Sequence, residues 1–222
     1  MSIAEKFEVI ADSVYEKGKE KERSDFWDVF QNKGKLNAFS SYQYAFSYGH
    51  WTDNNYNPKY TISAGYSCSY MYYMATGITD TKVDINLQYA TASVQVFRSS
   101  GLKTIRKLIV VAANTYNSWF AGCASLENIT FEGVIGNDIS FADCPLLTVE
   151  SMIGKVATEE QIAKGKNIIE LNGTYYYGGI LIALRDNSTT GVTNTLTLHA
   201  DAKAKLTDAQ KAIATEKGWT LA

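Results

Sequence analysis

The sequence predicts an α+β fold, in which a short solenoid of stacked parallel strands lies between an N-terminal helical segment and a C-terminal capping helix. The main observation is a phrase that occurs twice: Phe120-Ala-Gly-Cys123-Ala-Ser-Leu126 recurs 21 residues later as Phe141-Ala-Asp-Cys144-Pro-Leu-Leu147. A fixed period of this size is typical of solenoids, in which each unit repeats one bend of the chain. An apolar stripe near the N-terminus and a capping box near the C-terminus predict the two helical segments.

Two looser copies precede this pair. One reads Phe97…Ser100…Leu102…Ile105 and the other Met71…Met74…Ile78…Val83, while the clear copies continue to Ile129 and Phe131 and to Met152. We expect the apolar residues at these offsets to point inward. Each unit would supply one short strand, and no unit could bury its apolar side alone.

The first 34 residues are predicted to form a helical anchoring or oligomerisation segment. A helix is expected from residue 3 to about residue 30, because Ile3, Phe7, Ile10 and Val14 follow steps of four, three and four and so form one stripe. The same steps are those of a coiled-coil seam. Two interpretations remain open: the stripe is an oligomer interface, or it packs on the first repeat.

Residues 35–222 are predicted to form the rest of the protein, with a Tyr-rich region at 35–70. Tyr42, Tyr44, Phe46 and Tyr48 alternate with other residues, which favours a strand. Residues 54–58, Asn-Asn-Tyr-Asn-Pro, have the composition of a loop.

This loop holds the candidate ligand-binding residues, Trp51, Tyr56 and Tyr60. Aromatic side chains give large contact areas and can stack on sugar rings. Their neighbours are polar, so we expect the three rings to be exposed beside Asp53 and the asparagines. The alternative is that the tyrosines cover an edge of the solenoid and bury their rings.

The C-terminal third contains helix and turn signals. Residues 149–165 are expected to be helical, and Asn172-Gly173 is a hairpin turn. A strand is expected at 195–198, within a cap that covers about 195–222. Thr207 and Gln210 form a capping box, which opens a helix with Ala209, Ala212 and Ile213 inward and Gly218 at its end.

The composition excludes several function classes. The chain has 222 residues, of which 45% are hydrophobic, and a net charge of −2, so nothing favours nucleic acid or an anionic membrane. No apolar run is long enough to span a bilayer, and residues 1–10 do not resemble a secretory signal. We therefore expect the chain to be made in the bacterial cytoplasm.

The residues usually needed for catalysis or metal binding are scarce. Cys68, Cys123 and Cys144 lack the spacing of a zinc site, and no cofactor is expected. Cys123 and Cys144 would stack in adjacent units, close enough for a disulfide, but we favour two thiols that fill the core. His50 and His199 are interpreted as structural or solvated.

The phrase from Trp119 to Phe131 resembles the leucine-rich repeats of the BspA-like kind, whose units read Phe-x-x-Cys-x-x-Leu-x-x-Ile. The segment from Thr195 to Trp219 resembles the C-terminal part of repeat proteins encoded in phage and prophage tail regions of Gram-positive gut bacteria. The start is similar to theirs through residues 14–18, Val-Tyr-Glu-Lys-Gly, and 25–30, Asp-Phe-Trp-Asp-Val-Phe. The resemblance implies a leucine-rich-repeat fold and a virion or cell-surface setting.

From this resemblance we expect a non-enzymatic virion protein, associated with a phage or prophage tail or fibre, that presents a repeat surface. Its partners would be other virion proteins or a host cell-surface glycan or protein, with a homo-oligomer through the N-terminal helix. The alternative is a bacterial cell-surface adhesin of the same repeat type. The third possibility is a carbohydrate-active enzyme, which would need paired carboxylates, and the acids available are Glu132, Asp138, Asp143 and Glu150.

Overall fold

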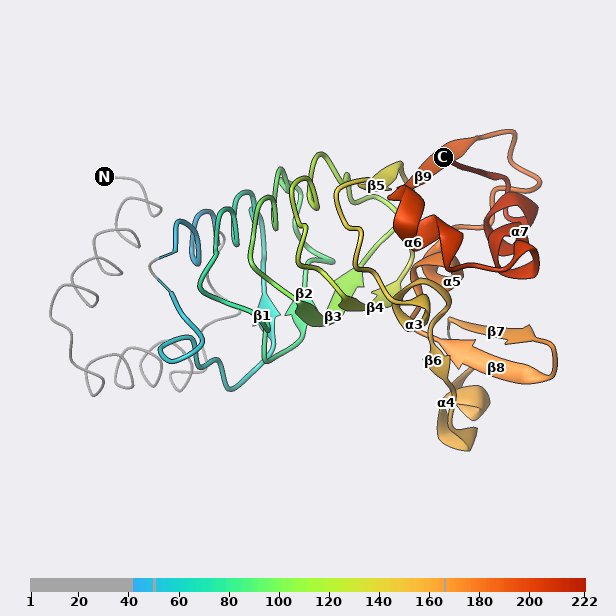
Figure 1. The fold of residues 1–222 in the computed structure, drawn as a ribbon, viewed down its shortest axis with the longest axis horizontal. Helices are drawn as coiled ribbons and strands as arrows, with labels where there is room; N and C mark the ends of the chain where they lie inside the picture. The colour runs from blue at the N-terminus through green and yellow to red at the C-terminus, as the bar shows by residue number, and fades with distance from the viewer. Residues whose placement is uncertain (1–41, 50, 166) are drawn as a thin grey trace, which may run out of the picture.

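The computed structural model describes residues 42–49, 51–165 and 167–222, which form one elongated body (Figure 1). The stripe Ile3, Phe7, Ile10 and Val14, His50 and the predicted segment 1–34 lie outside these residues. The described strands are β1 (Ile62–Ser63), β2 (Ile85–Asn86), β3 (Thr104–Val110), β4 (Asn128–Gly133), β5 (Ile139–Phe141), β6 (Lys155–Val156), β7 (Ile168–Leu171), β8 (Thr174–Tyr177), β9 (Asn194–Leu198) and β10 (Trp219–Leu221). The described helices are α3 (Val149–Ile153), α4 (Glu159–Lys164), α5 (Ile180–Ala183), α6 (Ala200–Ala204) and α7 (Asp208–Glu216).

Strands β1 to β4 form a parallel sheet in sequential order. Ile62, Ile85, Leu108 and Phe131 occupy one register position across the sheet, and all four are buried. These residues therefore carry the inner face of the sheet into the core, because side chains alternate between the two faces of a strand.

Two further sheets lie beyond β4. Strands β5, β9 and β10 form a parallel sheet with β9 in the middle, and β6, β8 and β7 form an antiparallel sheet with β8 in the middle. The predicted hairpin is confirmed: Asn172 and Gly173 join β7 to β8, and both have positive φ values, 52° and 78°. Two residues with positive φ match the right-handed twist of the flanking strands.

The predicted fold class is wrong. A solenoid of stacked strands would carry one ladder from the first repeat into the C-terminal cap. The described residues instead contain few helices and divide their strands among three small sheets, parallel and antiparallel. The ladder of β1 to β4 ends at Gly133, and β5 pairs instead with the distant β9. The hairpin at Asn172 then reverses the chain into the antiparallel sheet, which stacked parallel units do not contain.

Four tight turn segments, residues 42–48, 68–75, 93–100 and 116–123, lie on the edge of the body opposite β1 to β4 (Figure 1). Alternate backbone N–H groups of one segment donate to carbonyls of the next, as Phe46 does to Met71 at 2.8 Å and Tyr72 to Val96 at 2.7 Å. Two positions in each segment are left-handed: Tyr44 and Tyr48, Tyr70 and Met74, Gln95 and Ser99, Ser118 and Gly122. The alternating residues Tyr42 to Tyr48 are therefore turns and not the strand that their pattern predicts.

A ladder of aromatic rings fills the core behind these segments. Successive ring centroids lie 5.0, 5.5, 5.5 and 4.5 Å apart along Phe46, Tyr72, Phe97, Phe120 and Phe141. The prediction that the repeated apolar residues point inward is confirmed for the two clear copies, from Phe120 to Phe131 and from Phe141 to Met152. The looser copy begins at Tyr72 and not at Met71, one residue later than predicted. Tyr72 stacks in the ring ladder, whereas Met74, predicted to point inward, is exposed.

The predicted helices are confirmed in part. The stretch 149–165 contains two helices, α3 and α4, separated by β6. The capping box of Thr207 and Gln210 opens α7 as predicted, but its buried residues are Ile213 and Ala214, and Ala209 is exposed.

Candidate functional site

The three aromatic residues predicted to bind a ligand do not share a surface. Trp51 and Tyr56 are buried in the core, with 6% and 0% of their surface exposed, whereas Tyr60 is 57% exposed. The Tyr56 hydroxyl lies 2.5 Å from that of Tyr72 and donates to the carbonyl of Thr81 at 3.0 Å. Trp51 and Tyr56 are therefore structural.

The polar neighbours of these rings explain why the sequence suggested exposure. Asp53 accepts hydrogen bonds from the backbone N–H and the hydroxyl of Thr79, at 2.9 and 2.6 Å. Asn55, itself buried, accepts from the backbone N–H of Thr52 at 2.7 Å. Asn55 therefore satisfies the backbone of its own loop and Asp53 joins this loop to Thr79, while the rings turn inward.

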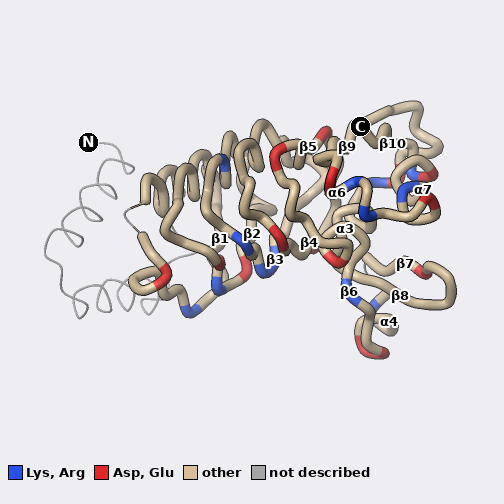
Figure 2. The backbone as a smooth tube through the Cα atoms, in the orientation of Figure 1, with Lys and Arg blue, Asp and Glu red and all other residues tan. Residues whose placement is uncertain are grey.

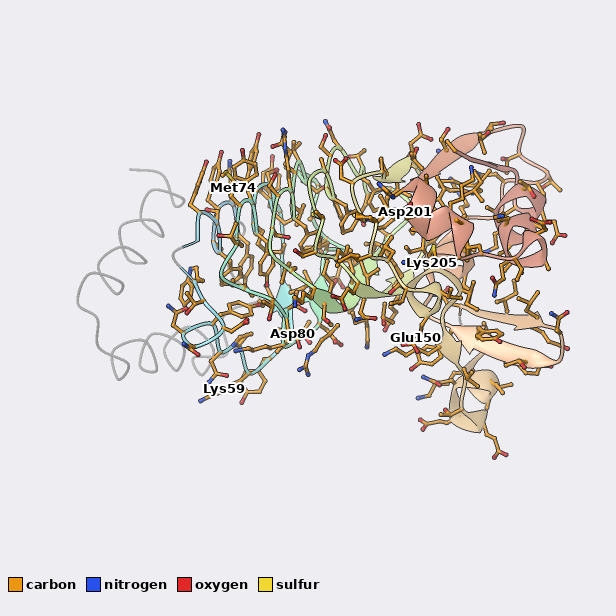
Figure 3. All side chains as sticks on the ribbon, in the orientation of Figure 1. Lys59, Met74, Asp80, Glu150, Asp201 and Lys205 are labelled. Atoms are coloured by element: carbon orange, nitrogen blue, oxygen red, sulfur yellow. The ribbon has the colours of Figure 1, made fainter. Side chains whose placement is uncertain are left out.

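A different aromatic cluster reaches the surface on the turn edge. We call it the tyrosine ridge, and it consists of Tyr44, Tyr48, Tyr70, Tyr73 and Met74. Tyr48 and Met74 are 49% and 42% exposed, and the other three are half-buried. Figure 3 shows Met74 on the turn edge and Asp80 on the opposite one.

The rings of the ridge pack on one another. Tyr44 and Tyr70 stack with centroids 4.8 Å apart and planes 5° from parallel, and Tyr73 packs edge-on against Tyr48 and Tyr70 at 5.5 and 5.6 Å. Such contacts hold the rings in place, and side chains that are already ordered lose less entropy when a surface is covered. Charged residues are sparse on this edge and gather instead along β1 to β4 (Figure 2).

The chain itself shows that this backbone does not require aromatic side chains. Tyr70, Tyr73 and Met74 correspond in the next turn segment to Gln95, Arg98 and Ser99, since Tyr70 and Gln95 are both left-handed, as are Met74 and Ser99. One segment further on, the corresponding residues are Ser118, Ala121 and Gly122. The ridge is therefore an addition to the turn segments and not a condition for forming them.

A second candidate site is a groove of about 760 Å³ between the outer face of β3 and β4 and the antiparallel sheet with α4. Its apolar lining includes Ile109, Val111, Ile168 and Tyr177, and Ile168 and Tyr177 lie opposite each other on β7 and β8. The other face of this hairpin packs on the core through Ile169, Leu171 and Tyr176. Asn167 ties the hairpin to the sheet by donating to the Gly133 carbonyl at 3.0 Å.

The charges of the groove balance one another. Lys107 lies 3.0 Å from Asp84 and 3.2 Å from Glu132, and Lys164 donates to Glu160 at 2.6 Å. Desolvation lowers the pKa of Lys107, but the hydrogen bonds that its ammonium donates to both carboxylates outweigh this effect and raise the pKa overall. Its ammonium therefore stays charged, and the groove carries no large charge of either sign.

The remaining residues weighed for catalysis have structural partners. His199 caps α6, its Nδ1 accepting from the N–H of Asp201 at 3.1 Å. Each of the four acids has another partner: Glu132 and Glu150 lie beside Lys107 and Lys155, while Asp138 and Asp143 accept from the backbone N–H groups of Thr195 and Gly122. Within the described residues, no group of three or more His, Cys, Asp or Glu could hold a metal ion.

The three cysteines are buried free thiols, which confirms the interpretation that Cys123 and Cys144 fill the core. Cys123 lies 2.9 Å from the carbonyl of Phe97, and Cys144 lies 3.7 Å from that of Phe120. Burial raises the pKa of Cys68 to about 12 and that of Cys123 to about 11, and it also raises the pKa of Cys144.

No helix in the part of the chain that the structure describes is long and apolar enough to cross a membrane. Comparisons with protein-family models, with curated proteins and with solved structures gave no match.

Proposed function

We propose that this chain is a non-enzymatic binding protein that recognises a partner on a cell surface or in a virion through the tyrosine ridge. The observation that carries the proposal is the contrast between successive turn segments. The same left-handed backbone carries Tyr70, Tyr73 and Met74 in one segment and Gln95, Arg98 and Ser99 in the next.

Two physical arguments support a binding role. Tyrosine, methionine and arginine are the residues enriched at the centres of protein interfaces, where Lys, Glu and Asp are depleted. Bulky residues with positive φ are uncommon, because the left-handed conformation brings Cβ close to the backbone and costs about 1–3 kcal/mol. Tyr44, Tyr48, Tyr70 and Met74 have φ between 53° and 61°, so the ridge is kept at a cost in stability.

The setting we propose is the one implied by the sequence resemblance, a phage or prophage tail or fibre-associated protein of Gram-positive gut bacteria. In that setting the ridge would contact the host surface or a neighbouring virion protein. The mutual packing of the rings favours a protein partner, because it covers ring faces that a sugar would need.

The test replaces the ridge with the residues of the next turn segment, in a triple variant Tyr70→Gln, Tyr73→Arg and Met74→Ser. Labelled full-length protein is measured by flow cytometry on intact cells of a panel of Gram-positive gut isolates. The control variant is Tyr89→Ser, which removes a 64% exposed tyrosine outside the ridge. Because an interface anchor contributes about 2 kcal/mol or more, we expect the triple variant to lose at least about 10-fold in binding with its melting temperature unchanged.

Equal binding by the triple variant and the wild type would refute the role of the ridge, as would an equal loss in Tyr89→Ser. Failure of the wild type to bind any isolate would refute the proposal that the ridge recognises the host surface.

A further inference from the structure

We infer that the groove between β3, β4 and the antiparallel sheet is a second binding site, and that its ligand is a short, linear, neutral oligosaccharide. This site shares no residue with the tyrosine ridge, and its strands β3, β4, β7 and β8 lie on the edge of the body opposite the turn segments (Figure 1).

The first argument is the small structural contribution of the elements that form the outer wall. Helix α4 has no buried residue, and both residues of β6 are exposed. The hairpin contacts the core with one face only. Together, β6, α4 and the hairpin bury little apolar surface. They therefore add little to the stability of the protein, since burial of apolar surface is the main favourable contribution. What they do create is the enclosed side of the groove.

The second argument is charge. Every charged side chain that lines the groove has a partner of opposite sign, Lys107 with Asp84 and Glu132, and Lys164 with Glu160. An ionised ligand would have to compete with these pairs, and an isolated charge brought out of water would lack a counter-charge. The balance therefore favours a ligand without net charge.

The third argument is the kind of polar group that is present. Gln88, Gln161 and Asn167 line the groove, and a carboxamide both donates and accepts hydrogen bonds. The Gln161 oxygen accepts from the Thr158 N–H at 2.8 Å, and Asn167 donates to Gly133, so both side chains are held in place. Sugar hydroxyls also donate and accept, which makes amides suitable partners for them.

The fourth argument is the apolar wall. Tyr177 and Ile168 face the groove side by side on neighbouring strands, with Ile109 on the sheet across from them. An aromatic ring next to amides fits a ligand with apolar C–H faces and polar edges, as a pyranose has. The volume of about 760 Å³ lies within the range of known ligand sites, which is about 300–1,000 Å³.

The experiment is calorimetric titration of the full chain with linear tetrasaccharides of glucose in α and β linkage, of N-acetylglucosamine, and of galacturonate as the charged comparison. We expect at least one neutral tetrasaccharide to bind with Kd below about 1 mM, and the galacturonate at least about 10-fold more weakly. No binding by any neutral member, or tighter binding of the charged one, would overturn the inference.

Two tyrosines of one strand provide a matched pair of variants. Tyr177 lines the groove, while Tyr175 lies on the same face of β8 outside the groove and is 38% exposed. We expect Tyr177→Phe to retain binding within about two-fold, Tyr177→Ala to lose at least about 10-fold, and Tyr175→Ala to match the wild type. Equal effects of Tyr177→Ala and Tyr175→Ala would place the ligand elsewhere.

The ridge triple variant separates this inference from the proposed function. It leaves every groove residue in place, so it should bind the tetrasaccharide as the wild type does. Loss of tetrasaccharide binding in that variant would assign the sugar to the ridge and overturn the inference about the groove.

Discussion

The three buried thiols predict how the stability of this protein depends on pH. A cysteine in the unfolded chain has a pKa of about 8.5, whereas burial raises the pKa of Cys68 to about 12 and that of Cys123 to about 11. Above pH 8.5 the unfolded chain therefore releases protons that the folded protein retains. Because the unfolded state then binds fewer protons, the free energy of unfolding falls as the pH rises.

The size of the effect follows from the pKa difference. At pH 9.5, one unit above the unfolded pKa, each buried thiol lowers the free energy of unfolding by about 1.4 kcal/mol relative to neutral pH. The stability of the protein with its thiols protonated is fully present below about pH 8. It is lost progressively as the pH rises toward the folded pKa. Three thiols together account for about 4 kcal/mol, a large part of the stability of a typical domain.

Cys123→Ala isolates one such contribution. The chain tolerates alanine at the corresponding position of an earlier turn segment, where Ala75 donates its N–H to Tyr72 just as Cys123 donates to Phe120. At pH 7.5 we expect the variant to be less stable by about 1 kcal/mol, because it lacks one buried group. By pH 9.5 this difference should shrink by about 1.4 kcal/mol and approach zero or change sign.

The assay is guanidinium unfolding followed by tryptophan fluorescence, with a reductant present, at pH 7.5 and 9.5. Lys217 acts in the opposite direction, because burial lowers its pKa to about 8, but it is the same in both proteins and cancels in the comparison. A stability difference between wild type and Cys123→Ala that stays constant over this pH range would show that the thiol is not held protonated by burial.

Three further predictions concern the stability of the fold and are measured by chemical unfolding. Leu147→Ala should cost about 2–5 kcal/mol, because Leu147 is fully buried, while the adjacent and exposed Leu146→Ala should cost under about 1 kcal/mol; similar values would contradict the packing. Asn114→Ala should cost about 2–4 kcal/mol, since this buried carboxamide accepts one backbone N–H and donates to two carbonyls; a neutral result would mean that these groups find other partners. Gly133→Ala should cost more than about 2 kcal/mol, because its Cβ would lie 1.9 Å from a backbone oxygen of β3, whereas Gly165→Ala meets no atom within 4 Å and should cost about 1 kcal/mol.

The sequence predicted local features that depend on neighbours in the chain. The burial of Phe120, Phe141 and the two cysteines follows from a pattern that recurs at fixed offsets, and the hairpin at Asn172 depends on two adjacent residues. The capping box at Thr207 is likewise confined to four residues. Such features can be predicted because the physical cause lies within the segment itself.

The fold class failed because it depends on pairings between distant segments. A repeat of 21 residues predicts that similar bends recur, but it does not say which strand the next one will contact. Strand β5 pairs with β9, more than 50 residues away, and no periodicity in the sequence indicates that partner. The groove was missed for the same reason, since it combines residues from 88 to 178.

The strand predicted from the alternating tyrosines was wrong for a different reason, which is the backbone conformation. In the segment from Tyr42 to Tyr48, the aromatic residues alternate as in a strand, yet Tyr42 and Phe46 are buried while Tyr44 and Tyr48 turn toward the surface. A strand would bury every second residue of this segment. Because φ is left-handed at Tyr44 and Tyr48, the buried aromatic residues are four positions apart instead. Tyrosine gives no sequence signal for that conformation, unlike glycine or asparagine.

The strained tyrosines also bear on what the ridge is for. If stability alone shaped the turn segments, the left-handed positions would carry the residues found in the last of them, Ser118 and Gly122. The first two segments carry large aromatic or thioether side chains there instead, and three of these positions place a tyrosine ring against another ring of the ridge. Tyr48 and Met74 nevertheless remain 49% and 42% exposed, so a partner that covers them would add apolar burial that the rings do not gain from one another.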